Sequence, residues 1–197
     1  MVVFDWNGTI MSDLRRAVGA TNAVLARRGL GPLSPQEFRA RFALPLDRWL
    51  VGLGVAAPDA PAAEREWNAA LATEPAAPRP EAATVLGDLV ARGALTGVVS
   101  AAGAEAVHAD VAGAGLAHLL GEVATGVRDK AAHLRVLRPR RARAVYVGDT
   151  TYDMASARRA GFTAVGVTGG YSTGRALRAA GADAVVDSLE DLLTVCG

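Results

Sequence analysis

The sequence predicts an α/β fold in which helices cover both faces of a parallel sheet. Five short apolar runs, most of them rich in valine, are typical of buried strands: MVVF, LTGVVS, AVYVG, TAVGV and DAVV. Helical patterns alternate with these runs over most of the chain, as they do where helices connect parallel strands. The exception is the region of about residues 13–73, which has helical patterning and no convincing strand.

The expected elements follow one another in a simple order. After the first run come the helical patterns of residues 13–73, and the proline-rich stretch EPAAPRPE then opposes continued helix and suggests a stiff linker. Later helices are expected near residues 80–92, 104–114, 130–137, 152–160, 174–180 and 189–195. Stop and start signals support several of them: Gly93, Gly161 and Gly181 as C-terminal stops, and Ser188 as an N-cap. We therefore expect an α/β core of residues 1–12 and 80–197, with an all-helical insertion at residues 13–79.

Composition limits the classes of function. The 197 residues are 51% hydrophobic and 21% charged, as in a soluble protein with one core and a modest insertion. A net charge of +1 gives no strong attraction to nucleic acid or membrane lipid, and no apolar run reaches the roughly 18 residues of a membrane span. The single cysteine, Cys196, can form no internal disulfide, and the first residues show no signal-peptide pattern. We expect a cytoplasmic protein that binds neither nucleic acid nor membrane.

Polar residues stand where three of the expected strands end. Asp5 follows the first strand, Ser100 ends the second, and Asp149 follows the strand AVYVG. The ends of parallel strands share one edge of the sheet, where ligands bind in such folds. Asp153 lies four residues after Asp149, so both carboxylates can face one pocket. Each acid alone could be a loop residue or a helix cap, but their joint placement indicates a site.

The lysine content singles out one more residue. Lys130, in GVRDKAAHL, is the only lysine among 21 basic residues. An ammonium is a compact point charge and an arginine is a planar fork, so the two are not interchangeable. Chance survival of one lysine and a functional role are about equally good explanations on this fact alone.

Four segments resemble the motifs of the haloacid dehalogenase superfamily, in order and at suitable intervals along essentially the whole chain. They are FDWNGTI, VVSAA, the lysine of VRDK, and VGDTTYDMASARRAG. The resemblance is to the phosphatase branch with a small helical cap inserted after the first strand, and within it to the phosphoglycolate phosphatase-like group. It implies a Rossmann-like core, an aspartate nucleophile, Mg²⁺, and transfer of a phosphoryl group through an aspartyl-phosphate.

Elementary chemistry agrees with these implied roles. Phosphoryl transfer requires alignment and charge neutralisation, and a carboxylate such as Asp5 can act as the nucleophile. Magnesium prefers oxygen ligands, and we expect these from Asp5 and Asp149, with Asp153 either binding the ion directly or supporting the ligands. The resemblance adds the backbone carbonyl of Asn7. The phosphate is expected to contact the following residues: Gly8, Thr9, Ser100, Ala101 and Lys130.

Asn7 departs from the family pattern. The family commonly has an aspartate two residues after the nucleophile, where it protonates the leaving group and then activates water. An amide can do neither at neutral pH. Positioned proton transfer contributes about 10²- to 10⁴-fold, so we expect slow turnover of alkyl phosphates, or selectivity for substrates with a good leaving group.

Two readings of function stay open at this point. The first is a magnesium-dependent phosphatase that acts on a small phosphorylated metabolite. The alternative is a hydrolysis-impaired protein that binds a phosphorylated ligand or partner, or a phosphotransferase. The phosphonate-cleaving branch also lacks the second acid, but it uses a cap lysine and residues 13–79 contain none. True dehalogenation is disfavoured because the acidic segment GDTTYD suits a metal.

Overall fold

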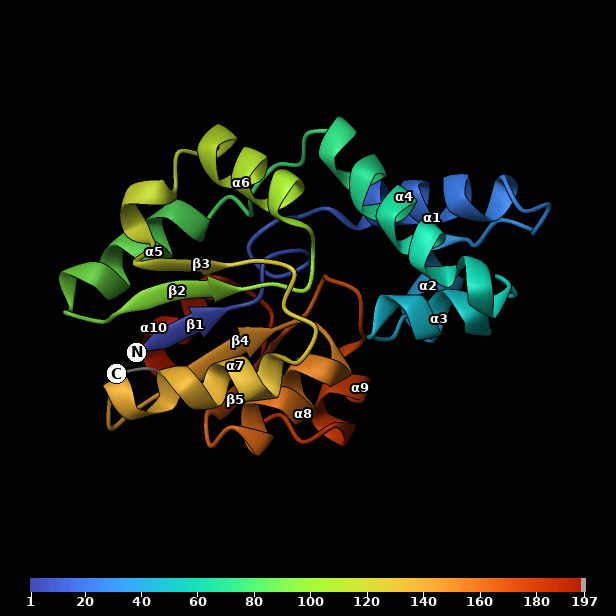
Figure 1. Ribbon diagram of the computed structural model, residues 1–197. Coiled ribbons are helices and arrows are strands. Elements are labelled where there is room, and N and C mark those ends of the chain that lie inside the picture. Colours follow the sequence, from blue (N-terminus) through green and yellow to red (C-terminus); the bar gives the residue numbers. More distant parts are fainter. Residues whose placement is uncertain (196–197) are drawn as a thin grey trace.

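A computed structural model of the chain describes residues 1–195, and Cys196 lies outside them. All six strands run parallel, in the order β3-β2-β1-β4-β5-β6 (Figure 1). Their bounds are β1 Val2–Phe4, β2 Thr96–Val99, β3 Glu122–Ala124, β4 Val145–Gly148, β5 Thr163–Val167 and β6 Ala184–Val186. The strand order reverses direction between β1 and β4, which makes this the point where a ligand site is expected.

Ten α-helices accompany the sheet in the described part of the chain. They are α1 Leu14–Ala26, α2 Pro35–Arg41, α3 Leu46–Gly52, α4 Ala60–Thr73, α5 Ala82–Ala91, α6 Ala104–Gly113, α7 Lys130–Leu137, α8 Thr151–Arg159, α9 Gly174–Ala179 and α10 Leu192–Val195. Short 3-10 helices occupy residues 57–59, 117–119, 138–140 and 189–191. No helix within residues 1–195 is long and apolar enough to cross a membrane.

Side chains of alternating residues along β1 enter two separate cores. Val2 and Phe4 belong to the core that includes buried residues of α5, α6 and α10. Val3 belongs to the core on the other face, with residues of α7, α8 and α9. Because successive side chains of a strand point to opposite faces, a three-residue strand can be buried on both sides. Helices therefore cover both faces of the sheet, so a ligand site can form only at an edge of the sheet.

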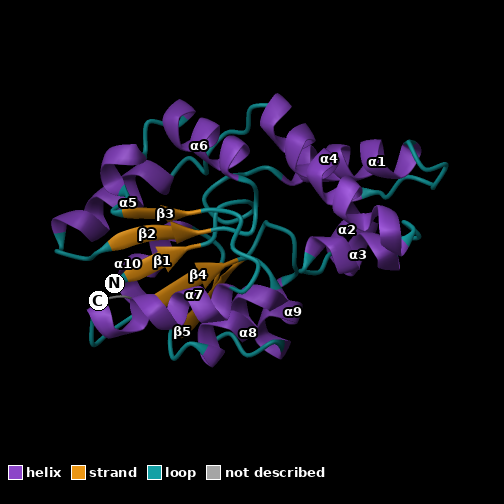
Figure 2. Cartoon of the chain, in the orientation of Figure 1, coloured by secondary structure: helices purple, strands orange, loops and turns teal. Residues whose placement is uncertain are grey.

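The helices α1–α4 form a separate group beside the carboxyl edge of the sheet (Figure 2). We call this group, residues 14–73, the helical unit. Its apolar residues pack against one another, and Trp67 and Leu71 of α4 are buried at 4% and 0% exposure. Ser34 begins α2 with a capping box in which its hydroxyl accepts the N–H of Glu37. The helical unit lies beside the edge of the sheet at which β1 ends and Asp5 follows.

The fold class predicted from the sequence is confirmed, with one omission. The five expected strands are present, and the helices of residues 80–180 agree with the expected ranges to within two residues. The strand β3 was not predicted, because it has only three residues and all are half-buried. Gly93, Gly161 and Gly181 have φ angles of +78°, +74° and +92°, as expected for C-terminal stops.

Candidate functional site

Three carboxylates meet at the carboxyl edge of the sheet. Asp5 follows β1, Asp149 follows β4, and Asp153 lies in the first turn of α8. One oxygen from each of them can be chosen so that all three lie within 4.8 Å of one another. All three residues are buried. Three buried anions this close repel one another, so a compensating positive charge is required.

Lys130 supplies part of that charge. It is the first residue of α7 and is fully buried. Its Nζ donates to Asp5 Oδ1 and to Asp153 Oδ1, at 2.7 Å in each case. The only lysine of the sequence thus lies between two of the three acids, where a point charge can serve both.

Asp149 is held by backbone that approaches it very closely. The N–H of Tyr171 donates to Asp149 Oδ2 at 2.6 Å, and the Thr9 hydroxyl donates to Oδ1 at 3.0 Å. A Cβ atom at Gly8 or Gly170 would lie 2.1 or 2.2 Å from Asp149 Oδ2. Gly8 also has a φ angle of +76°. Glycine is needed at both positions because a side chain would occupy the place of the carboxylate.

Asp153 already uses both of its oxygens within the protein. Its Oδ1 accepts from Lys130 and, at 3.3 Å, from the Tyr146 hydroxyl. Its Oδ2 accepts the N–H and the hydroxyl of Thr150, at 3.1 and 2.5 Å, in the capping box that begins α8. Asp5 accepts fewer hydrogen bonds, from Lys130 through Oδ1 and from the backbone N–H of Trp6. Asp5 and Asp149 therefore have more capacity for a new ligand than Asp153 has.

Burial dominates the proton affinities of the site. Burial raises the pKa of Asp5 to about 6, and the charge of Lys130 offsets only part of this rise. Burial also raises the pKa of Asp149 well above its usual value, and the charges of Asp5 and Asp153 add to the effect. For Lys130, burial opposes the charged form, but Asp153 and Asp5 outweigh it and raise the pKa. Lys130 stays charged, but its single positive charge does not fully neutralise the carboxylates.

The carboxylates open onto a small cavity of about 30 Å³. Its lining comes from the sheet edge and from the helical unit: Asp5, Asn7, Phe42, Leu44, Leu46, Trp67, Ser100, Ala101, Ala102, Lys130, Thr150 and Tyr171. A larger cavity of about 340 Å³ is lined by the opposite edge of the sheet, where β2 begins, and touches none of the three acids. The chemistry of the molecule is thus concentrated at the smaller cavity.

Three of the residues predicted to bind phosphate line this cavity: Ser100, Ala101 and Lys130. Ser100 Oγ accepts the N–H of Ala102 at 3.1 Å and donates to no described residue, so its proton is available to a ligand. Ala101 is the next residue of the same loop. Gly8 and Thr9 are used differently, because the N–H of Gly8 donates to Asp13 and that of Thr9 to the carbonyl of Trp6. Neither N–H points to a ligand in this conformation.

The amide of Asn7 has a fixed orientation. Its Nδ2 donates to Asp13 Oδ2 at 2.7 Å. Asp13 is held in turn by the N–H of Gly8, the hydroxyl of Tyr171 and the guanidinium of Arg16, at 2.8, 3.0 and 3.1 Å. A reversed amide would place its oxygen against a carboxylate oxygen, and two acceptors repel. Asn7 Oδ1 is accordingly buried and has no partner among the described residues.

The donor set fits a small, hard cation. The ligands are carboxylate oxygens, with no thiol or imidazole among them. If all three acids are ionised, Lys130 balances only one of their charges. A divalent ion with oxygen ligands would supply the missing charge, as Mg²⁺ does in phosphate-handling sites.

Comparison with known proteins agrees with this geometry. Residues 2–167 match the haloacid dehalogenase-like hydrolase family. The chain belongs to this family. It is 31% identical to a phosphoglycolate phosphatase of Caulobacter vibrioides over 217 aligned positions, which cover 99% of this chain and 90% of the relative.

Two solved structures have the same fold as this haloacid dehalogenase-like hydrolase. A haloacid dehalogenase-like family hydrolase of Streptococcus pneumoniae superimposes with a TM-score of 0.82 at 14% identity, covering 100% of this chain and 97% of the other. CbbY of Rhodobacter sphaeroides, solved in complex with phosphate, has a TM-score of 0.74 at 20% identity, covering 97% and 95%. At these identities the likeness concerns the fold alone.

Several residues of the hydrolase site were not singled out from the sequence. Asp13 orients Asn7, Tyr171 contacts both Asp13 and Asp149, and Tyr146 donates to Asp153. The loop VTGGYSTG, which contains Gly170 and Tyr171, is explained equally well from its sequence as a simple glycine-rich turn. A useful signal was its position, since it follows a strand at the same sheet edge as Asp5.

Proposed function

We propose that the chain is a magnesium-dependent phosphatase that acts on a small phosphorylated metabolite through an aspartyl-phosphate on Asp5. One observation carries this proposal: a buried aspartate at a strand end has a lysine ammonium 2.7 Å away and two further carboxylates within 4.8 Å. This arrangement supplies a nucleophile together with the charges that an incoming phosphate requires. The similarity to a phosphoglycolate phosphatase supports the same class of substrate. The proposal includes a cytoplasmic location.

Each residue has a part in the proposed reaction. Asp5 attacks phosphorus through Oδ2, the oxygen that does not accept from Lys130. Lys130 keeps Oδ1 oriented and offsets the negative charge of the phosphoryl group. Ser100 donates its free hydroxyl to a phosphate oxygen, next to Ala101. Gly8 and Thr9 shape the turn that presents Asp5 and Asn7.

Mg²⁺ would be held by Asp5, Asp149 and the backbone carbonyl of Asn7. Asp153, whose oxygens are already engaged, would support the site by orienting Lys130. When bound, the ion neutralises charge on the transferring group. The close packing of Gly8 and Gly170 on Asp149 limits the directions that its carboxylate can take.

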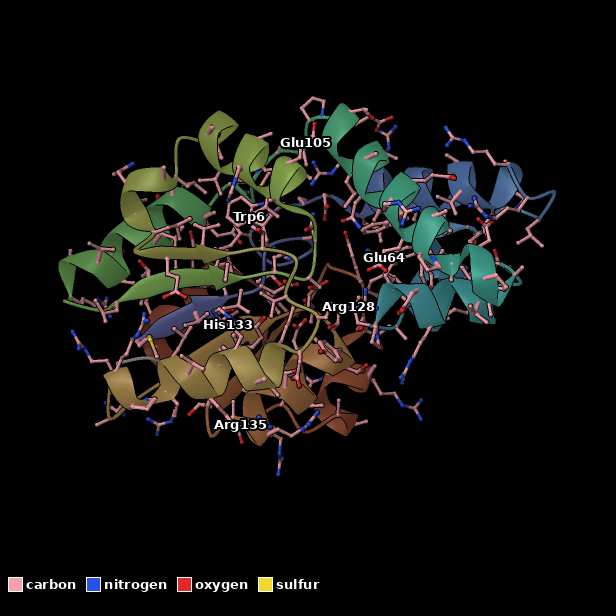
Figure 3. The ribbon with its side chains drawn as sticks, in the orientation of Figure 1. Trp6, Glu64, Glu105, Arg128, His133 and Arg135 are labelled. Carbon is pink, nitrogen blue, oxygen red and sulfur yellow. The ribbon has the colours of Figure 1, made fainter. Side chains whose placement is uncertain are left out.

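Residues 13–79 would act as a cap over a core of residues 1–12 and 80–197. In Figure 3, Arg128, two residues before Lys130, faces Glu64 of α4. Its guanidinium pairs with Glu64 at 3.2 Å and with Asp47 at 2.6 Å. The Asn68 side chain accepts the N–H of Gly103 from the other side of the cavity. These contacts hold the helical unit against the core, and release of product would require them to part.

Asn7 would make turnover slow for substrates whose leaving group needs a proton. Its amide has no acidic proton to give, and its free atom is an acceptor oxygen. The oxygen can accept a hydrogen bond from an attacking water and so orient it. The same residue motivates the second candidate function, a protein that binds a phosphorylated ligand, or passes the phosphoryl group to an acceptor other than water.

The test of this proposal is phosphate release with magnesium across sugar phosphates, phosphoglycolate, nucleotides and acyl phosphates. Mass spectrometry of acid-quenched protein would detect a phosphoryl group on the peptide that contains Asp5. We expect release and labelling in the wild type, and neither in Asp5→Asn. Labelling without release of phosphate would favour the phosphotransferase. Ligand-induced thermal stabilisation with neither labelling nor release would favour the binding protein.

Magnesium is expected to raise the melting temperature more at about pH 7.5 than at about pH 5. The pKa of Asp5 is about 6 in the folded protein and near 3.8 when the chain is unfolded. The metal-free fold therefore holds extra protons between these values and loses stability as the pH rises through them. Magnesium must displace those protons, so its binding is about tenfold weaker one pH unit below the pKa of Asp5.

The measurement is thermal unfolding with chelator or with millimolar magnesium at each pH. Asp149→Asn is the control, because it removes one ligand and one of the mutually repelling charges. We expect that variant to respond little to magnesium at either pH. An equal rise in the melting temperature of the wild type at both pH values would contradict a site built on these carboxylates.

A further inference from the structure

The helical unit contributes an apolar wall to the cavity. Phe42, Leu44, Leu46 and Trp67 form it, and none of the arginines of residues 14–73 appears in the described lining. The indole N–H of Trp67 is already donated to the Thr21 hydroxyl at 3.0 Å. A charged group buried against this wall would lose its hydration and find no partner. The wall therefore disfavours a substrate with a second anionic group.

Two arginines at the boundary between the helical unit and the core are engaged elsewhere. Arg39 donates to the carbonyls of Gly170 and Gly169, at 3.0 and 3.3 Å. Arg128 pairs with Asp47 and Glu64. The wall itself is thus apolar, and Lys130, the cation in the described lining, is already paired with Asp5 and Asp153.

A second observation concerns protons. Asn7 gives its N–H to Asp13 and presents only an acceptor to the cavity. The hydroxyls of Thr150 and Tyr171, which also line the cavity, are donated to Asp153 and Asp13. Ser100 keeps a free hydroxyl, but an alcohol is far too weak an acid to protonate an alkoxide in competition with water. The ammonium of Lys130 is held between Asp5 and Asp153, so the site has no dedicated acid for the leaving group.

We propose that the preferred substrates are acyl phosphates, the mixed anhydrides of phosphoric acid with a small apolar carboxylic acid. This inference rests on the proposed phosphatase function and specifies its substrate class. A carboxylate is a stable anion and leaves without a proton, which suits Asn7. The apolar acyl chain suits the wall of Phe42, Leu44, Leu46 and Trp67. The new charge forms at the oxygen beside the phosphate and Lys130, away from the wall.

The reaction balances without any further reagent. Asp5 Oδ2 forms a bond to phosphorus as the bond from phosphorus to the acyl oxygen breaks, and the electron pair leaves with the carboxylate. Water, oriented by Asn7 Oδ1, then attacks phosphorus and the bond to Asp5 breaks. The carboxylate of Asp5 is regenerated. Both protons of the water leave with the inorganic phosphate or pass from it to solvent.

Three phosphates of similar size test the inference: propionyl phosphate, n-propyl phosphate and phosphoglycolate. The measurement is kcat/KM for phosphate release with magnesium, with the rate of Asp5→Asn subtracted to remove spontaneous hydrolysis. We expect propionyl phosphate to exceed n-propyl phosphate by about 10²-fold or more, the usual contribution of the missing proton transfer. Phosphoglycolate is expected to be no better than n-propyl phosphate, because its carboxylate would face the wall.

A variant of the wall separates its effect from that of Asn7. Leu44→Arg adds a cation and is expected to raise kcat/KM for phosphoglycolate by about tenfold, since a hydrogen bond to a charged group is worth that much. Leu44→Met is the matched control and should change little. A wild type that prefers phosphoglycolate, or that treats the propyl and propionyl compounds alike, would overturn the inference and leave the phosphatase standing. Absence of phosphate release and of labelled Asp5 with all three would overturn the phosphatase itself.

Discussion

Exchanging Asn7 for aspartate, together with Asp13 for asparagine, is expected to raise kcat for n-propyl phosphate by about 10²- to 10⁴-fold, the usual worth of positioned proton transfer. The introduced acid can protonate the leaving alkoxide and then accept a proton from water. The introduced amide can donate to it, which keeps the present 2.7 Å hydrogen bond with donor and acceptor exchanged. The oxygen of that amide can still accept from the N–H of Gly8 and the hydroxyl of Tyr171. Arg16 loses its acceptor at position 13 and keeps its pair with Asp110.

The two single variants are the controls for this exchange. Asn7→Asp alone places two carboxylates at hydrogen-bond distance, and one of them must then hold a proton. We expect a smaller gain in kcat and a lower melting temperature than for the double variant. Asp13→Asn alone adds no acid and should not accelerate the reaction. If neither variant with aspartate at position 7 turns over faster than the wild type, proton transfer is not what limits this site.

Lys130→Met is expected to lower the free energy of unfolding by about 3–5 kcal/mol in the absence of metal, as removal of one member of a buried ion pair does. The buried ammonium lies 2.7 Å from both Asp5 and Asp153, and within residues 1–195 no other positive side chain pairs with them. Methionine fills a similar volume, so the loss reports the charge rather than a cavity. Urea unfolding with a chelator present measures it.

The pH dependence distinguishes lost charge from lost packing. Burial already raises the pKa of Asp5 and Asp149, and removal of the ammonium raises that of Asp5 further. At about pH 5 Asp5 is mostly protonated and needs no cation, so the loss of stability should be smaller there than at about pH 8. Lys130→Arg retains the charge but replaces a point donor by a planar fork, and should be intermediate. A loss that does not change with pH would indicate packing alone.

The sequence predicted the acids of the site because their placement follows a general rule. Asp5, Ser100 and Asp149 stand at the ends of parallel strands, and such ends meet at one edge whatever the rest of the chain does. Lys130 was recognised by its chemical rarity and by the family motif, and its position was then given by the start of α7. These predictions required no knowledge of loops.

The partners of those residues could not be predicted in the same way. The contact between Asp13 and Tyr171 joins positions 158 residues apart and depends on the conformation of two loops. Asp13 occupies the N-cap position of α1, yet its side chain makes no capping hydrogen bond there. It is engaged by Asn7, Gly8 and Arg16 instead. Local patterns carry no information on such distant pairs.

Arg16 illustrates the same limit on a larger scale. Its guanidinium is buried and binds Asp110 of α6 at 2.7 Å as well as Asp13. Asp110 also accepts the indole N–H of Trp6, the residue directly after Asp5. From the sequence, Arg16 is one of many arginines on a helix and would be assigned to the surface. Only the assembled fold shows that it connects the helical unit to the loop of the nucleophile.

Tyr171 couples the position of the proposed cap to the arrangement of the site carboxylates. Its ring packs edge-on against Phe38 and Phe42, with centroids 5.2 and 4.9 Å away. Its hydroxyl and its N–H hold Asp13 and Asp149. Lifting the cap would remove the aromatic neighbours from a residue that positions two carboxylates. We expect the carboxylates to hold their reactive positions only while the proposed cap is closed over the cavity. An acyl phosphate, which water hydrolyses readily, would then meet Asp5 only after bulk water has been excluded.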